Sequence, residues 1–137
     1  MNYSLGTISF AKSDYSNTMF HLSKIQKETG LLKYLQKNLY MKIYYELNDY
    51  ESFICSFDAF KHFIKRKNIL DDEKGLAISK ISDHIKILFK LREKFNKFEL
   101  EQLKIDVNEY RFLNHTWLIS KIDELELANR LELKIRN

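Results

Sequence analysis

Apolar residues recur at helical spacing along almost the whole chain. Within the segment 31–47, for example, Leu31, Leu35, Leu39 and Ile43 follow one another at intervals of four residues. A helix with 3.6 residues per turn places such positions on one face, whereas a half-buried strand would alternate apolar and polar residues. The pattern therefore predicts an all-α fold.

Short polar segments between the periodic stretches divide the chain into about seven predicted helices. Pro is absent and Gly occurs three times, which favours long helices joined by short polar loops. Thr29-Gly30 is typical of a helix C-terminus, and Asn48-Asp49 and Asp71-Asp72-Glu73 are typical of helix starts. The predicted helices are 2–12, 15–28, 31–47, 50–67, 72–93, 97–110 and 115–134.

The chain contains an internal repeat. An offset of 35 residues aligns residues 4–25 with residues 39–60 and preserves both residue type and helical phase. Two copies of one helical hairpin explain this register. The matched pairs are Ile8/Ile43, Phe10/Tyr45, Asp14/Asp49, Tyr15/Tyr50, Met19/Ile54, Leu22/Phe57 and Ile25/Phe60.

A period near 34 residues with a helix–turn–helix pattern is typical of tetratricopeptide repeats, and the first copy resembles their consensus. Gly6 would let a neighbouring helix approach closely, Asp14 would start the second helix, and Tyr15 would cover the turn. The resemblance is carried by Leu5-Gly6, Phe10, the turn Ser13-Asp14-Tyr15 and the inward positions Met19, Leu22 and Ile25.

The copies also depart from that consensus. Thr18 and Phe53 stand where a small Ala is usual, and Met41 stands where copy two would have Gly. Ile25 and Phe60 replace a later small residue, and the Pro that commonly ends a repeat is missing. Because cores are close-packed, these bulkier residues predict altered helix crossings and a degenerate array.

The segment LQKNLYMKIYYELNDYESFICSFDAFKHFIKRKN also resembles the C-terminal helical region of uncharacterised bacterial tetratricopeptide proteins, over roughly residues 20–125. The resemblance implies one helical-repeat domain over 1–137, built as a tetratricopeptide-like α-solenoid of stacked antiparallel hairpins. Repeat-like hairpins are expected at about 2–28 and 31–67, and divergent helices at 72–137 as an atypical capping region. We expect the terminal part of a longer array.

Composition predicts a folded chain in a reducing compartment. Apolar residues make up 45% of the sequence, far more than in disordered segments. The neighbours of the single cysteine, Cys55, predict a buried thiol, and no signal peptide or long apolar span is apparent. We therefore expect a cytoplasmic protein that does not enter a membrane.

No motif for catalysis is present, so we expect no enzyme activity, no cofactor and no metal. The four histidines lack the i, i+4 pairing that would hold a metal, and we expect each to have a surface or half-buried structural role. The chain has no glycine-rich phosphate loop and no nucleophile elbow. The histidines are His21, His62, His84 and His115.

The resemblance implies a partner-binding groove lined by the first helix of each hairpin. Tyrosine suits such a surface because it combines a rigid ring with a hydroxyl. Phe10 and Tyr45 have an equally good alternative as packing residues between hairpins. The implied partner-binding residues are Tyr3, Thr7, Phe10, Asn38, Lys42 and Tyr45.

Basic residues supply a second candidate surface. Net charge is +4, which is too mild to indicate nucleic-acid binding by itself. The row Lys86, Lys90, Lys94 and Lys97 has spacings of four and three, which would place its charges on one helix face. Interspersed acidic residues favour a solvated exterior instead. The second cluster is Lys61, Lys65, Arg66 and Lys67.

The sequence thus favours a non-catalytic module that binds a protein or peptide. Nucleic-acid binding through the basic clusters is the first alternative. A purely structural role, in capping or oligomerisation, is the second, with self-association through exposed solenoid ends. The sequence does not identify the partner.

Overall fold

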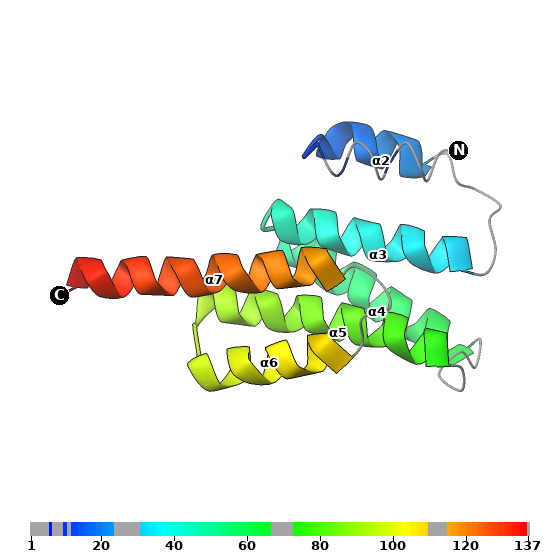
Figure 1. The fold of residues 1–137 in the computed structure, drawn as a ribbon. Helices are drawn as coiled ribbons and strands as arrows, with labels where there is room; N and C mark the ends of the chain where they lie inside the picture. The colour runs from blue at the N-terminus through cyan, green and yellow to red at the C-terminus, as the bar shows by residue number, and fades with distance from the viewer. Residues whose placement is uncertain are drawn as a thin grey trace. The chain divides into compact units, whose positions relative to one another are not determined.

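The structure is a computed structural model that describes residues 6, 10, 12–23, 31–66, 73–109 and 115–136. Within these residues the chain forms six helices and no strand (Figure 1). The all-α prediction is confirmed. The helices are α2 (Tyr15–Ser23), α3 (Leu31–Glu46), α4 (Tyr50–Arg66), α5 (Glu73–Glu93), α6 (Lys97–Glu109) and α7 (His115–Arg136).

The six described helices correspond to six of the seven predicted ones, and α7 ends two residues later than expected. Residues 24–28, predicted as the end of the second helix, lie outside the described residues. The remaining prediction, a helix at 2–12, falls mostly outside the described residues, although Gly6 and Phe10 are both helical. The Gly30 cap and the carboxylates of Asp71 and Asp72 also lie outside them. The chain divides into two compact units, Met1–Phe60 and Lys61–Asn137, with the boundary inside α4.

The two turns of the predicted repeat share one backbone geometry. Among the described residues other than glycine, Ser13 and Asn48 have positive φ, at 61° and 55°, and they are 35 residues apart. The amide of Ser13 donates to the carbonyl of Phe10 at 2.9 Å, and the amide of Asn48 donates to the carbonyl of Tyr45 at 3.1 Å. A left-handed residue with such a bond is a common way to end a helix. The same turn therefore ends the first helix of each copy.

The same two turns also start the next helix in the same way. The amide of Asn17 donates to Oδ1 of Asp14 at 3.2 Å, and the amide of Ser52 donates to Oδ1 of Asp49 at 3.1 Å. Each Asp thus satisfies a backbone N–H that has no partner inside the helix. The sequence prediction that Asp14 and Asp49 begin helices is confirmed.

Asn48→Gly is expected to stabilise the fold by roughly 0.5–1 kcal/mol. Glycine has no Cβ and adopts a positive φ without the steric cost that asparagine carries there. Urea denaturation followed by circular dichroism measures the change. Asn48→Ala supplies the contrast, because it should destabilise, and equal midpoints for both variants would contradict the turn geometry.

Asp49→Ala is expected to destabilise at pH 7 but not in strong acid. The side-chain and backbone hydrogen bonds from Ser52 lower the pKa of Asp49. Its stabilisation is therefore present above the unfolded pKa of about 4 and is lost as the pH falls through the lowered folded pKa. Urea midpoints at several pH values test this. Asp58→Ala, which removes an exposed carboxylate from the middle of α4, should show no comparable loss.

Helices α2 and α3 pack together around the core of the first unit (Figure 1). Leu22, Leu39 and Ile43 form this core, and the rings of Phe10 and Tyr15 lie 5.7 Å apart. A Cβ added at Gly6 would lie 3.4 Å from the Leu22 side chain. This distance is ordinary van der Waals contact, so the expectation that Gly6 is needed for a close helix approach stays a prediction. Partly buried residues packed on this core are Phe10, Tyr15, Met19 and Tyr40.

Helix α4 buries one apolar face and exposes the opposite side. Phe53 and Phe57 are four residues apart and point inward with ring centroids 5.7 Å apart. Cys55 lies between them in sequence and is exposed. Cys55 lies two residues from each phenylalanine, and two residues correspond to a rotation of roughly 200° around a helix. Because Phe53 and Phe57 face inward, Cys55 lies on the opposite, exposed face. The prediction of a buried thiol is wrong for this reason.

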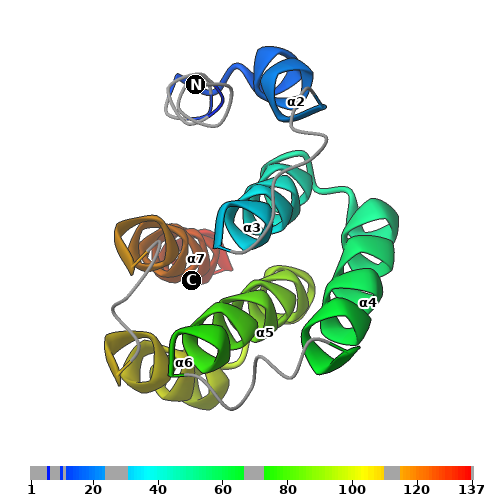
Figure 2. The same cartoon turned by 90° about the vertical axis from the view of Figure 1, so that its right-hand side faces the viewer.

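In the second unit, α5, α6 and α7 pack against one another in alternating directions, and Figure 2 shows them nearly end-on. Asn96 starts α6, because its Oδ1 accepts from the amide of Glu99 at 3.0 Å. The buried apolar residues are Ile81, Ile85, Leu88, Phe89, Leu91, Leu100, Leu103, Val107, Leu118, Ile122 and Leu125.

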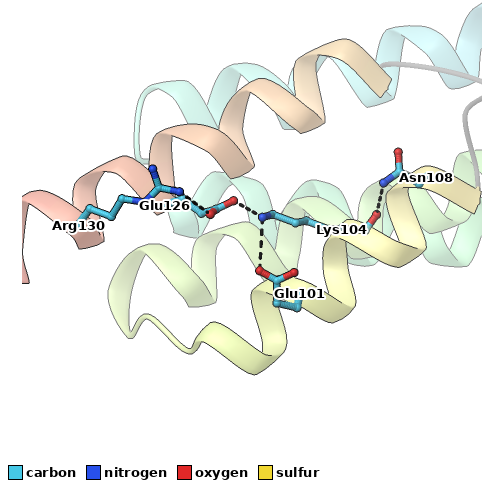
Figure 3. A network of polar contacts seen from close by, with 5 residues as sticks. All are labelled: Glu101, Lys104, Asn108, Glu126 and Arg130. Atoms are coloured by element: carbon cyan, nitrogen blue, oxygen red, sulfur yellow. Dashed lines mark hydrogen bonds and ion pairs between the residues drawn. The ribbon is translucent and has the colours of Figure 1, made fainter.

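An ion-pair network joins α6 to α7 (Figure 3). Lys104 on α6 pairs with Glu126 on α7 and with Glu101 at 3.4 Å, and Glu126 also pairs with Arg130 at 3.3 Å. The Lys104–Glu126 hydrogen bond raises the pKa of Lys104 and lowers that of Glu126. Asn108 donates to the carbonyl of Lys104 at 2.9 Å. Each such surface pair contributes at most about 1 kcal/mol.

His84 on α5 departs from the sequence expectation for the histidines. It is 1% exposed, and neither ring nitrogen has a hydrogen-bond partner within the described part of the chain. Burial lowers its pKa, nearby Asp106 and Asp83 oppose this shift, and Lys80 adds to it. His84 therefore lies neutral in the core and does not have the surface or half-buried role that was predicted, because α5 is buried around more of its circumference than its polar residues suggest.

His84→Leu is expected to make the fold less sensitive to acid. Between the lowered folded pKa and the unfolded value of about 6.5, the unfolded chain binds more protons, so stability rises with pH. The substitution removes this slope and an unsatisfied polar group, which costs on the order of 1 kcal/mol. Urea midpoints at pH 5 and 7.5 measure the slope. His62→Leu, at an exposed position on α4, should keep it, and an unchanged slope in His84→Leu would contradict the assignment.

Candidate binding site on α3

The described members of the predicted groove are Phe10 and three residues of α3. Tyr3 and Thr7 lie outside the described residues. Asn38, Lys42 and Tyr45 are 2%, 6% and 2% exposed. Their assignment to partner binding stays a prediction, and any ligand must reach side chains that are covered in this conformation.

The helical spacing of α3 brings these polar groups together. Asn38, Lys42 and Tyr45 are separated by four and three residues, so they share one helix face. Apolar residues between them in sequence, Met41 and Ile43, are fully buried on other faces. Helix α3 is therefore buried around most of its circumference, and its polar residues are enclosed with the apolar ones.

Lys42 is the most perturbed cation in the described part of the chain. Burial lowers its pKa from 10.5 to about 8, and the negative charge of Glu46, one turn along α3, partly opposes the shift. Its Nζ lies 4.8 Å from the centroid of the Phe10 ring, which is cation–π distance. At pH 7 the amine is still mostly protonated. Lys42 thus places a poorly solvated positive charge beside an aromatic ring.

Asn38 adds a hydrogen-bond acceptor one turn away. Its Oδ1 is buried and has no hydrogen-bond partner among the described residues. Leaving such an oxygen unsatisfied costs roughly 1–3 kcal/mol. An unsatisfied polar atom in a native core calls for an explanation, and a ligand that donates a hydrogen bond is one.

Together, these residues would suit a ligand that offers both a donor and an acceptor. Asn38 Oδ1 would accept from the ligand, and Lys42 Nζ would donate to it. A lysine of lowered pKa is also a feature of amine nucleophiles. However, Lys42 is 6% exposed, so a carbonyl substrate does not reach its nitrogen in this conformation.

The predicted basic row does not form one helix face. Helix α5 ends at Glu93 and α6 begins at Lys97, so Lys94 and Lys97 are not on the helix that carries Lys86 and Lys90. The Asn96 cap starts a new helix between Lys94 and Lys97, so a spacing rule for a continuous helix does not apply. Lys90 also pairs with Glu99 at 2.9 Å.

The second basic cluster is partly neutralised. Lys61 pairs with Asp83 at 2.8 Å and donates to Ser79 Oγ at 2.8 Å, which joins the end of α4 to α5. Lys65 and Arg66 are exposed in the last turn of α4, and Lys67 lies outside the described residues. The positive charge of this cluster therefore rests on fewer cations than the sequence suggests.

Across the described ranges, no group of three or more His, Cys, Asp or Glu residues is placed to hold a metal ion. No helix of the described chain combines the length and apolar character needed to cross a membrane.

Sequence reasoning selected Asn38 and Lys42 but missed their burial. The available signal was their position between apolar residues such as Leu39, Met41 and Ile43, which indicates a helix buried on more than one face. No protein-family model, no curated protein and no solved structure matches the chain.

Proposed function

We propose that this chain is a non-catalytic helical-repeat module that binds a protein through an extended peptide segment. The hairpins would stack as in the tetratricopeptide repeats that the sequence resembles, with the last helices capping the array. The observation that carries the proposal is the pairing of an unsatisfied acceptor, Asn38 Oδ1, with the buried cation Lys42 on one face of α3.

A peptide backbone suits this pair because every residue other than proline offers one N–H and one C=O. A backbone N–H would satisfy Asn38 Oδ1, and a carbonyl or carboxylate oxygen would accept from Lys42. An anionic or strongly polar acceptor near the amine favours its charged form. Binding should therefore raise the lowered pKa of Lys42.

The duplicated turn supports the repeat architecture. Ser13 and Asn48 share a positive φ, and Asp14 and Asp49 share a capping hydrogen bond, at an offset of 35 residues. Repeats of one hairpin present a continuous surface made from equivalent helices. Such surfaces commonly bind partners.

Access to the site requires local opening. Asn38 and Lys42 are almost fully buried, so a ligand reaches them after the covering side chains move aside. The apparent affinity is then reduced by the fraction of molecules in the open form. We expect modest affinity for short peptides and slow association.

The test is a peptide-library selection with the purified chain, followed by calorimetric titration of selected peptides. Asn38→Leu removes the acceptor, retains side-chain volume and leaves no unsatisfied oxygen, so the fold should persist. We expect it to weaken binding at least tenfold. Asn108→Leu, at an exposed position on α6, is the matched control and should bind as the native chain does.

A second variant tests how much the Phe10 ring contributes to peptide binding. Phe10→Ala removes the ring that lies over Lys42 and should also weaken binding. If Asn38→Leu and Phe10→Ala remain folded and bind the selected peptide with native affinity, the proposed site is wrong.

Nucleic-acid binding remains the alternative proposal. It predicts an affinity that falls steeply with salt, because each phosphate contact releases counterions. We expect no saturable binding that depends on Lys86, Lys90 and Lys94. Fluorescence anisotropy with labelled single- and double-stranded probes at low salt tests this. Tight binding that Lys86→Glu and Lys94→Glu abolish would instead favour the alternative.

A further inference from the structure

The last turns of α7 carry an apolar face that no described helix covers. Leu127 and Leu131 are 56% and 51% exposed, and Ile135 beside them is 86% exposed. Residues 130–135 are all exposed, whereas Leu118 and Ile122 nearer the start of α7 are buried against the second unit. Figure 1 shows α7 continuing past the ends of α5 and α6. The face is therefore accessible along the outer half of the helix.

The exposed positions form a regular seam. Glu124, Leu127, Leu131 and Lys134 are separated by three, four and three residues, which is the spacing of core positions in a helix pair. We call these four residues the α7 seam. At about 1.5 Å per residue the seam is roughly 15 Å long.

The charges at the two ends of the seam are complementary under an antiparallel two-fold. If a second α7 crosses midway between Leu127 and Leu131, each Leu127 faces Leu131 of the other copy. Each Glu124 then faces Lys134 of the other copy. A parallel pair would place like charges opposite one another, so charge selects the antiparallel arrangement.

The side chains around the seam are compatible with this pairing. Glu124 accepts from Lys121 at 3.2 Å within its own helix, yet its side chain is 62% exposed and can contact a second cation. Lys134 makes no ion pair with any described residue. Arg130, which flanks the seam, pairs with Glu126 of its own chain at 3.3 Å. The flanking positive charge is thus already compensated.

We infer that the α7 seam is a self-association site, and that its occupant is the α7 seam of a second copy of this chain, antiparallel to the first. A pair of seams this short buries less surface than a standard stable interface, which buries more than about 1,000 Å². We therefore expect a weak dimer, with a dissociation constant on the order of 100 μM. This inference is independent of the peptide site on α3, because the two use different residues and different units.

Sedimentation equilibrium of the full chain at increasing concentration tests the inference. The weight-average mass should rise from monomer towards dimer with a dissociation constant on the order of 100 μM. Leu131→Glu places a charge in the middle of the seam and should weaken association at least tenfold. A mass that stays monomeric up to about 1 mM would overturn the inference.

Leu133→Glu is the matched control. Leu133 has the same residue type and the same 51% exposure as Leu131, and lies two residues further along α7, roughly 200° around the helix. Association should therefore stay within twofold of the native value. Circular dichroism confirms that both variants keep their helices. If both variants lose association equally, the association depends on exposed apolar surface in general. That result would overturn the inference that the α7 seam is the contact.

Charge exchange tests the orientation. Glu124→Lys and Lys134→Glu each place like charges opposite one another, so each variant alone should associate at least threefold more weakly. A mixture of the two single variants, and the double variant, should regain association. If mixing and double substitution both fail to restore it, the antiparallel seam is wrong, whatever the outcome of the peptide-binding test.

Discussion

Phe53→Ala is expected to lower the free energy of unfolding by about 3–5 kcal/mol, the largest effect of a single substitution among our predictions. The Phe53 side chain is fully buried on α4, with the ring of Tyr50 at 6.2 Å and that of Phe57 at 5.7 Å. Truncation removes the transfer free energy of a phenyl ring and leaves a cavity that the neighbours fill only in part.

A loss of this size is a large share of the 5–15 kcal/mol that stabilises a typical domain. Chemical denaturation followed by far-UV circular dichroism measures it. Phe98→Ala removes the same ring from a position on α6 that is 71% exposed, and should change stability by less than about 0.5 kcal/mol. Equal and small losses in both variants would contradict the packing of α4.

Lys42→Met is expected to stabilise the fold by about 2 kcal/mol at pH 7. Burial lowers the pKa of Lys42 to about 8, so the folded state disfavours the charged amine relative to the unfolded chain. Replacing buried ion pairs by well-packed apolar side chains of similar volume is often neutral or stabilises a protein by about 1–4 kcal/mol, and a single buried charge carries the same kind of desolvation cost. The loss of the contact between Lys42 and the Phe10 ring offsets part of the gain.

The sign of this effect fixes its pH dependence. Between the folded pKa of about 8 and the unfolded value of 10.5, the unfolded chain binds more protons, so the stability of the native chain rises with pH. The advantage of Lys42→Met should therefore be full below pH 8 and small above about pH 10.5. Lys65→Met, at an exposed position on α4, should show no such dependence. A constant advantage at all pH values would contradict the burial of the charge.

The helices were predictable because their signals are local. The starts at Tyr15, Tyr50 and Lys97 were each predicted to the residue. Capping side chains mark these positions, with Asp14 before α2, Asp49 before α4 and Asn96 before α6. The repeated turn was also predictable, because the Asp-Tyr pair and its apolar neighbours keep one register.

Burial was less predictable because it depends on which helix face meets a neighbour. Cys55 has apolar neighbours in sequence but lies on the exposed face of α4, and His84 has polar neighbours but lies in the core. The prediction that Lys86, Lys90, Lys94 and Lys97 share one helix face was wrong for another reason, because α5 ends between Lys90 and Lys94. Asn38 and Lys42 were selected through a family resemblance, and their burial came from the structure.

Nuclear magnetic resonance of the Lys42 side chain during peptide titration tests the proposed function most directly. The experiment uses the chain with its lysine Cε carbons labelled, and a peptide obtained from the library selection. We predict that Lys42 titrates with a pKa of about 8 in the free protein, and that saturating peptide shifts its resonance and raises this pKa. An unperturbed Lys42 in the free protein, or a peptide that binds without moving its resonance, would contradict the binding site on α3.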